Sequence, residues 1–190
     1  MDPFAILFDF YPEDTPLRKL LLKHSCQVRD KALEIMDMKE NAALPLDRET
    51  VVNGALLHDI GVVLCHAPAI LCEGHDNYLR HGLIGAQMLR EYAAQHHLTL
   101  EKYAKICERH TGSGLAAQEI IDQKLPLPPQ DFLPETNEEK LICLADKFFS
   151  KSGQMREKPV GQVWTSLDKF GIHAANRLHD LFDCFHLKHC

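Results

Sequence analysis

The sequence predicts an all-α protein, a compact bundle of several helices. Apolar residues recur at spacings of three and four along nearly every long segment, residues that favour helix starts precede those segments, and no segment reads convincingly as a strand. At 190 residues, the whole chain is expected to form a single domain, because domains of about 100–150 residues are the commonest.

The first predicted helix begins at Thr15-Pro16, a capping residue followed by proline at the first helical position. Apolar residues then follow at helical spacing from Leu17 to Ile35, and His24 lies on the same stripe. His24 is therefore expected to face the core.

Asp47 is expected to cap a second helix that turns its apolar residues and Asp59 inward and ends at Gly61. Residues 62–78 contain proline and glycine and are predicted to form a loop with at most a short turn. A loop of this length is often functional, for example as a lid.

A third helix is predicted over about 79–97, and Thr99 is expected to cap a fourth that ends near His110. A fifth short helix should span about 115–124. The proline-rich run that follows, at 125–129, cannot be helical and is interpreted as a connector.

Thr136 and Glu139 have the spacing of a capping box, which predicts a helix that carries Asp146. Two C-terminal helices are expected over about 160–170 and 173–188, split at Gly171.

The adjacent pair His58-Asp59 ends the apolar run of the second helix. Burial of such groups is costly unless they are paired or bind a metal. Neighbouring helical residues project about 100° apart, so the pair suits a centre that is held from two sides. Each further candidate stands on a separate helical segment, and together with the pair they form a set of six: His24, His58, Asp59, His81, His110 and Asp146.

Each candidate also has a purely structural interpretation. His24 could be a core histidine, the two aspartates could form buried salt bridges, His81 could cap its helix, and His110 could favour a helix C-terminus. A purely structural explanation of the whole set requires that all of these interpretations are true at once. Arg109 and Lys147 flank candidate ligands and are expected either to be solvated or to bind phosphate.

The order His, His-Asp, His, His, Asp over roughly residues 20–150 resembles the HD superfamily of metal-dependent phosphohydrolases. Ile60-Gly61 matches its His-Asp-Ile-Gly variant, and the segments 81–85 and 145–147 are also similar to that branch. The resemblance implies an HD-domain-like bundle with a metal site at its centre. Its metal-site core would span about 15–150, and the C-terminal helices about 159–188.

The resemblance further implies two divalent transition-metal ions, for which imidazole and carboxylate suit iron, manganese, nickel, cobalt or zinc. Asp59 would bridge them and count as catalytic, with His24, His58 and Asp146 on one ion and His81 and His110 on the other. Such a pair activates water for attack on phosphorus. Lys147 or Arg109 would hold a phosphate oxygen.

The function implied is cleavage of a small phosphate ester or anhydride, with a nucleotide or a dinucleoside polyphosphate as the expected substrate. Two alternatives stay open. One is an HD-type di-iron oxygenase that acts on a small polyol or phosphonate, because such enzymes use the same ligand order. The other is a non-catalytic helical domain that binds a nucleotide or a partner.

The composition limits which binding partners and which cellular compartment are expected. The net charge of −6 disfavours a broad nucleic-acid surface, and no segment approaches the roughly 18 apolar residues of a membrane span. The seven cysteines include no C-x-x-C pair, which favours reduced core thiols in a cytoplasmic protein without a signal peptide. A small phosphorylated molecule is the expected partner, and the oligomeric state is not predicted.

Overall fold

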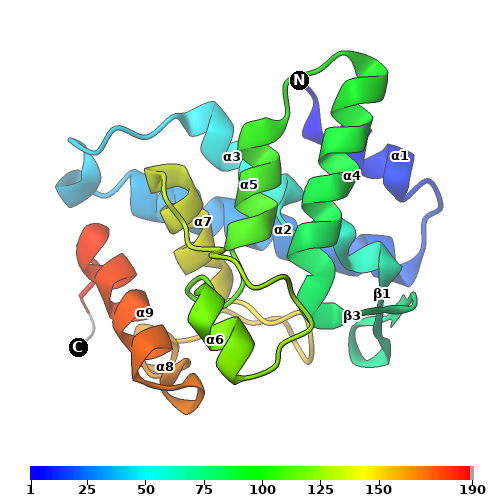
Figure 1. Ribbon diagram of the computed structural model, residues 1–190. Coiled ribbons are helices and arrows are strands. Elements are labelled where there is room, and N and C mark those ends of the chain that lie inside the picture. The colour runs from blue at the N-terminus through cyan, green and yellow to red at the C-terminus, as the bar shows by residue number, and fades with distance from the viewer. Residues whose placement is uncertain (189–190) are drawn as a thin grey trace.

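The computed structural model describes residues 1–188 and confirms the all-α fold class. Its helices pack around a common apolar core, as Figure 1 shows. Their bounds are α1 Pro3–Phe10, α2 Pro16–Met36, α3 Arg48–Leu57, α4 His81–His96, α5 Glu101–Arg109, α6 Ala117–Asp122, α7 Asn137–Lys147, α8 Val160–Trp164 and α9 Ile172–Cys184.

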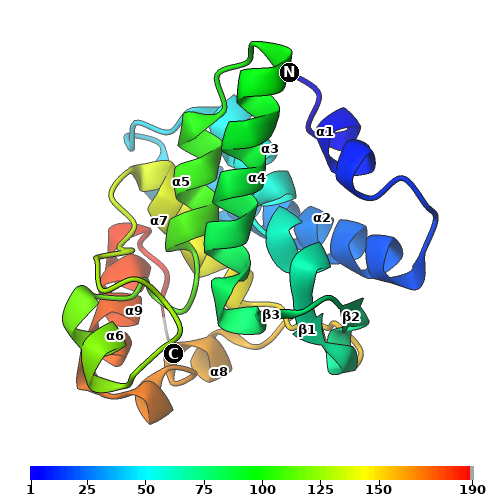
Figure 2. The same ribbon diagram turned by 45° about the vertical axis from the view of Figure 1, so that its right-hand side comes forward.

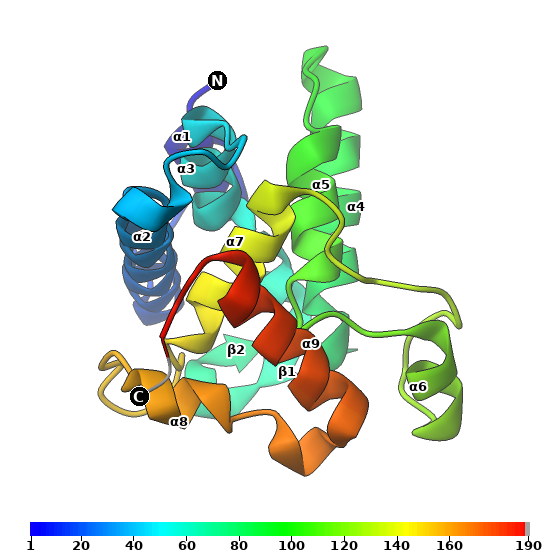
Figure 3. The same cartoon turned by 90° about the vertical axis from the view of Figure 1, so that its left-hand side faces the viewer.

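Helix α7 runs through the middle of the bundle. Figure 3 shows it between α2 on one side and the neighbouring helices α4 and α5 on the other. Its residues from Leu141 to Asp146 are all buried, so this helix contributes to the core on every side. A side chain on α7 can therefore meet side chains from both flanking layers.

Two of the predicted helix starts are confirmed in detail. Thr15 accepts a hydrogen bond from the amide of Arg18 at 3.1 Å, with Pro16 at the first position of α2. Thr136 accepts one from the amide of Glu139 at 3.2 Å. The carboxylate of Glu139 accepts from the amide of Glu135 at 2.7 Å and not from that of Thr136, so only half of the predicted capping box forms. Such caps satisfy donors that a helix leaves open at its start.

The C-terminal helices close the bundle over α7. Phe182 and Phe185 on and after α9 are fully buried. The ring of Phe182 lies 6.4 Å from that of Phe148, which directly follows α7. This contact ties the C-terminal segment to the helix that carries Asp146.

The segment between α3 and α4 contains a small sheet, which corrects the prediction of a loop without strands. Its strands are β1 Cys65–Ala67, β2 Cys72–Glu73 and β3 Asp76–Asn77, in the order β2-β1-β3. β1 pairs with β2 antiparallel and with β3 parallel. Strands of two or three residues are too short to show the alternation by which strands are recognised. Figure 2 shows the sheet beside the lower end of α4.

Three predicted helix boundaries were wrong. The second helix ends at Leu57, and a 3-10 helix over Ile60–Leu64 continues the chain past Gly61. α5 begins after Leu100, so Thr99 does not cap it. The helix predicted at 160–170 is the shorter α8, followed by a 3-10 turn.

Helix α1 was not predicted. It begins with a cap by Asp2, whose carboxylate accepts from the amide of Phe4, and it has Pro3 at its first position. Ile6 and Leu7 are buried in the common core. The start signal is the same as at Thr15-Pro16, a capping residue followed by proline, but no helix was predicted from it here.

Glycines allow the close approach of α4 to its neighbours. A Cβ atom at Gly61 would overlap the carbonyl oxygen of His81 and the amide of Gly85. A Cβ at Gly82 would overlap the carbonyl of Cys107 on α5. The start of α4 therefore rests directly on backbone from two other segments.

All cysteines among residues 1–188 are free thiols, and four of them, at positions 65, 72, 107 and 143, are buried. This agrees with their predicted role as small core residues. Cys190 lies outside the described residues. No helix in the described part of the chain combines the length and hydropathy needed to cross a membrane.

Candidate metal centre

The structure brings all six predicted ligands into one buried cluster. His24 comes from the middle of α2, the pair His58-Asp59 from the end of α3, and Asp146 from α7. His81 is the first residue of α4, and His110 directly follows α5. Five separate segments thus converge on one point.

Asp59 lies between two pairs of histidines. Its Oδ2 atom is 3.1 Å from Nε2 of His24 and 3.0 Å from Nε2 of His58. Its Oδ1 atom is 3.3 Å from Nε2 of His81 and 3.4 Å from Nε2 of His110. Each carboxylate oxygen therefore faces a different pair, the arrangement of a bridging ligand.

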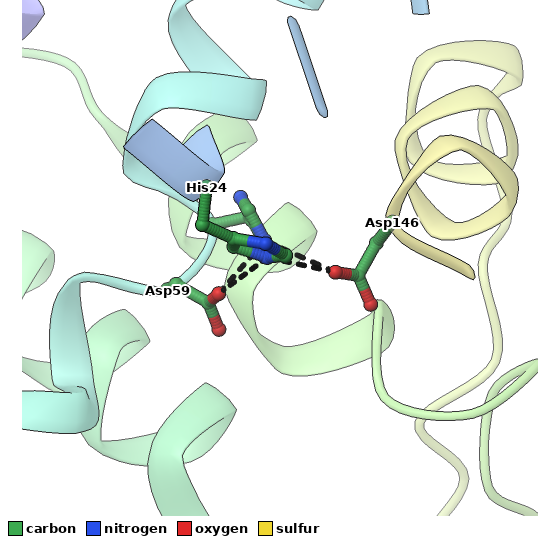
Figure 4. A group of neighbouring side chains, drawn as sticks. His24, Asp59 and Asp146 are labelled. Carbon is green, nitrogen blue, oxygen red and sulfur yellow. Dashed lines mark ion pairs between the residues drawn. The ribbon is translucent and has the colours of Figure 1, made fainter. Parts of the chain in front are cut away.

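Asp146 completes the first group from the opposite side. Its Oδ1 atom is 3.0 Å from Nε2 of His24 and 3.7 Å from Nε2 of His58. Figure 4 shows the carboxylates of Asp59 and Asp146 directed at the His24 ring from two sides. Two overlapping groups result, one of His24, His58, Asp59 and Asp146, the other of Asp59, His81 and His110.

Backbone carbonyls orient three of the imidazole rings. Nδ1 of His58 lies 2.7 Å from the carbonyl oxygen of Ala55, and Nδ1 of His81 lies 2.7 Å from that of Tyr78. His110 repeats the pattern with Cys107 at 2.8 Å. A proton on each Nδ1 leaves the Nε2 lone pair directed at the centre, as metal-binding histidines require.

The atoms at the centre fit a cation. Nε2 of His81 and Nε2 of His110 are only 2.9 Å apart, so two lone pairs would face each other without a positive charge between them. Within residues 1–188, neither nitrogen of His24, nor Nε2 of His58, nor Oδ1 of Asp59 has a hydrogen-bond donor or acceptor in ordinary geometry, although all are buried. Buried acceptors without donors are costly, and divalent cations would satisfy them.

Electrostatics of the cluster agree with a site built for positive charge. Burial works against the charged form of His58, but the carboxylates of Asp59 and Asp146 raise its pKa to about 9. Burial lowers the pKa of His110 to about 4, helped by the neighbouring histidines. The pKa values of both carboxyls lie well below the usual range, because the surrounding histidines and lysines outweigh burial.

Two lysines hold the carboxylates of the cluster. Lys147, one of the predicted phosphate-binding residues, lies 2.8 Å from Oδ2 of Asp146. Lys151 lies 2.6 Å from Oδ2 of Asp59 and was missed by the sequence analysis. It stands four residues beyond Lys147 in a segment without a recognisable motif, so only the fold reveals its position.

Arg109, the other predicted phosphate-binding residue, is engaged elsewhere. Its Nη1 atom pairs with Glu135 at 2.8 Å and with the buried Glu139 at 2.9 Å. These contacts tie the end of α5 to the start of α7. The structure thus shows a bracing role for Arg109 between two elements that carry ligands.

Comparison with known proteins places the cluster in a family. Residues 21–150 match the family model described as HD domain. This chain belongs to the HD-domain family. The matched range contains all six cluster residues, and it makes the chain a member of the superfamily of metal-dependent phosphohydrolases. HD domains bind divalent metals, and the buried histidines and aspartates could hold them.

Three curated proteins are similar to parts of this chain. An uncharacterised protein of Methanocaldococcus jannaschii is 37% identical over 126 residues, which cover 66% of this chain and 64% of that protein. A tRNA (cytidine(56)-2'-O)-methyltransferase of Picrophilus torridus is 34% identical, over 69% of this chain and 32% of the enzyme. Its namesake from Thermoplasma volcanium is 33% identical, over 85% and 40% respectively. The similarity thus spans less than two thirds of each relative, and no solved structure matches the chain significantly.

Proposed function

We propose that this HD-domain protein is a phosphohydrolase that cleaves a small phosphate ester or anhydride, with a nucleotide or dinucleoside polyphosphate as the substrate. The observation that carries the proposal is the position of Asp59. Its two oxygens face separate histidine pairs at 3.0–3.4 Å. A carboxylate in that position can hold two divalent ions side by side.

The residues divide naturally between two ions. His24, His58 and Asp146 would hold one, His81 and His110 the other, and Asp59 both. When bound, such a pair supplies a water of lowered pKa and neutralises charge on phosphate oxygens. Six ligands are more than one ion normally takes from protein. Metal analysis would show whether iron, manganese, nickel, cobalt or zinc is bound.

The lysines favour phosphate as the reacting group. An ion held by His24 and His58 would compete with Lys151 for Oδ2 of Asp59. Lys147 lies on Oδ2 of Asp146, whereas Oδ1 faces the histidines. Both ammonium groups would therefore lie beside the centre, where they could contact a substrate oxygen. An anionic phosphoryl group would be stabilised by both. A neutral polyol, the substrate class of the oxygenase alternative, gains little from two such charges.

The names of two relatives indicate methyl transfer to tRNA, a different reaction. Their similarity to this chain covers only 32% and 40% of their lengths, so the remainder of those chains can carry the methyltransferase activity. For this chain we propose a small phosphorylated substrate and no nucleic-acid partner, in line with the net charge of −6. We also propose a cytoplasmic location, which suits its free thiols.

The experiment combines metal content with turnover. Protein stripped with a chelator is reloaded with Mn²⁺ and assayed for phosphate release from nucleotides and dinucleoside polyphosphates. We expect up to two equivalents of metal and metal-dependent release of phosphate. Protein that loads with metal, keeps its helical circular dichroism and releases no phosphate from any compound would contradict the proposal.

A further inference from the structure

Two cavities adjoin the metal cluster on the side of the C-terminal helices. The first, here called the apolar pocket, has a volume of about 400 Å³. Its walls are mainly hydrophobic and include Leu79, Leu115, Leu125, Leu167, Phe170 and Ala174. Small-molecule sites are commonly concave and apolar, with volumes of about 300–1,000 Å³, so this cavity has the size and character of a ligand pocket.

The second cavity, here called the lysine pocket, has a volume of about 580 Å³. It is lined by Lys147, Lys158 and Lys169, together with the cluster residue Asp146 and the exposed Asp168. Nζ of Lys158 donates to the carbonyl oxygens of Lys147 and Phe149 at 2.9 and 3.2 Å. Its pKa is lowered by burial, and the neighbouring lysines add to the effect. Once ions take up the charge of Asp146, the pocket is positive.

The two pockets meet at shared residues. Lys147, Leu167 and Phe170 line both of them. Lys147 also contacts Asp146 and the carbonyl oxygen of His110, the latter at 3.4 Å. These shared residues lie between the two cavities, so a phosphate beside Asp146 and a group in the apolar pocket would both contact Lys147.

The wall of the apolar pocket is held firmly in place. Arg177 of α9 pairs with Glu119 of α6 at 2.7 Å and donates to the carbonyl oxygen of Gly114 at 3.0 Å. The buried hydroxyl of Ser113 donates to the carbonyl oxygen of Ala174 at 2.8 Å. Figure 1 shows α6 beside α9. The pocket is thus a built feature, whose sides are joined by an ion pair and buried hydrogen bonds.

Part of this wall lies outside the HD match. The match ends at residue 150, whereas Lys158, Leu167, Phe170 and Ala174 follow it in the chain. The segment that follows the match therefore shapes the space next to the metal cluster. Phe170 lines both pockets and is 54% exposed. Nζ of Lys169 lies 5.0 Å from the centroid of its ring, so a planar group would stack on the other face.

We propose that the two pockets select the substrate, a compound with two or more phosphoryl groups and a planar apolar group. The phosphates would lie in the lysine pocket beside Asp146, and the planar group would stack on Phe170 in the apolar pocket. A nucleoside diphosphate meets this description. The proposal rests on the proposed function, because a loaded metal site would neutralise Asp146 and so leave the lysine pocket more positive.

Binding of two probes distinguishes the contribution of the apolar pocket from that of the lysine pocket. Titration calorimetry with protein loaded with redox-inert Zn²⁺ would use two probes, inorganic pyrophosphate and the non-hydrolysable methylene analogue of ADP. Stacking on an aromatic ring is worth about 1–3 kcal/mol, or about 5- to 150-fold in affinity. Phe170→Ala should weaken binding of the ADP analogue to that extent and leave pyrophosphate within about twofold. Lys169→Gln should weaken both probes, since the lysine pocket would hold the phosphates of each.

Exposed residues outside both pockets supply the controls. Ile172 is 66% exposed and lines neither pocket, so Ile172→Ala should change nothing. Lys39→Gln removes an exposed lysine that lines neither pocket and controls for net charge. Equal affinity of Phe170→Ala and the wild type for the ADP analogue would overturn the proposal, as would an equal loss for both probes.

The outcome is distinguishable from failure of the proposed function. If no phosphate ester is hydrolysed but Phe170→Ala still discriminates between the probes, the pockets stand as a binding site and hydrolysis is wrong. If esters are hydrolysed and the variants bind both probes like the wild type, only the assignment of the pockets is wrong.

Discussion

Replacement of Asp59 by alanine is the most direct test of the cluster. The change removes the one carboxylate common to both groups and leaves His24, His58 and Asp146 on one side but only His81 and His110 on the other. Two imidazoles alone are a poor site. We therefore expect metal content to fall to one equivalent or less, and turnover to be lost.

The size of the effect can be worked out from the ligand count. Loss of a residue that merely supports a ligand costs about 10–100-fold in metal affinity, so about 100-fold is a lower bound for the bridging ligand itself. A 100-fold loss is about 2.7 kcal/mol. Each kcal/mol shifts the melting temperature of a chain of this size by about 2–4 °C. Metal-loaded Asp59→Ala should therefore melt about 5–11 °C below the metal-loaded wild type.

Elemental analysis, thermal scans with increasing Mn²⁺ and phosphate release would be measured on the same samples. Circular dichroism should stay helical, because the neighbouring core residues Leu57 and Ile60 are untouched and fully buried. Asp180→Ala, a change at an exposed position of α9, serves as the control. A folded Asp59→Ala protein with full metal content and wild-type turnover would refute the bridging role.

Three further predictions address charge, protons and oxygen. Lys151→Met removes the ammonium that lies 2.6 Å from the buried Asp59 carboxylate, and loss of one partner of a buried pair costs about 3–5 kcal/mol. The metal-free variant should therefore melt about 6–20 °C below the metal-free wild type, and the difference should be smaller after metal loading. An unchanged melting temperature would show that the pair does not stabilise the fold. Because the pKa of His58 is raised to about 9, its proton stabilises the metal-free protein at low pH, and this stabilisation disappears as pH rises through about 9. A bound ion must displace that proton, so Mn²⁺ affinity should rise by about tenfold per pH unit between pH 7 and 9. Affinity that is independent of pH in titration calorimetry would contradict this. Turnover with Mn²⁺ should persist under strict anaerobiosis as phosphate release; activity only with iron and air would favour the oxygenase alternative.

Much of the cluster could be predicted because its residues sit in regular helices. The apolar stripe of α2 predicts that His24 points inward, and His24 is fully buried. A capping signal and a helical stripe place Asp146 on α7 in the same way. Where a side chain belongs to a periodic element, periodicity alone tells which side of the element it faces.

The other features of the site depend on how segments without regular secondary structure pass one another in the fold. Lys151 lies beyond the end of α7, and its contact with Asp59 follows from the course of the chain and from no local pattern. The strands at 65–77 have two or three residues each, too few to carry a period. Arg109 was expected either to be solvated or to bind phosphate, and its ion pairs with Glu135 and Glu139 could not be predicted, because these residues lie far along the chain, just before and at the start of α7.

The contact between Gly61 and the start of α4 sets a dimension of the metal centre. Asp59 stands two residues before Gly61, and His81, whose carbonyl a Cβ at Gly61 would overlap, opens the helix that faces it. The spacing between the carboxylate and the second histidine pair is therefore fixed by backbone touching backbone. A methyl group at Gly61 would act as a wedge and spread the two halves of the centre by about the thickness of that group. Glycine after His-Asp thus lets α4 pack directly on this backbone and keeps His81 close to Asp59.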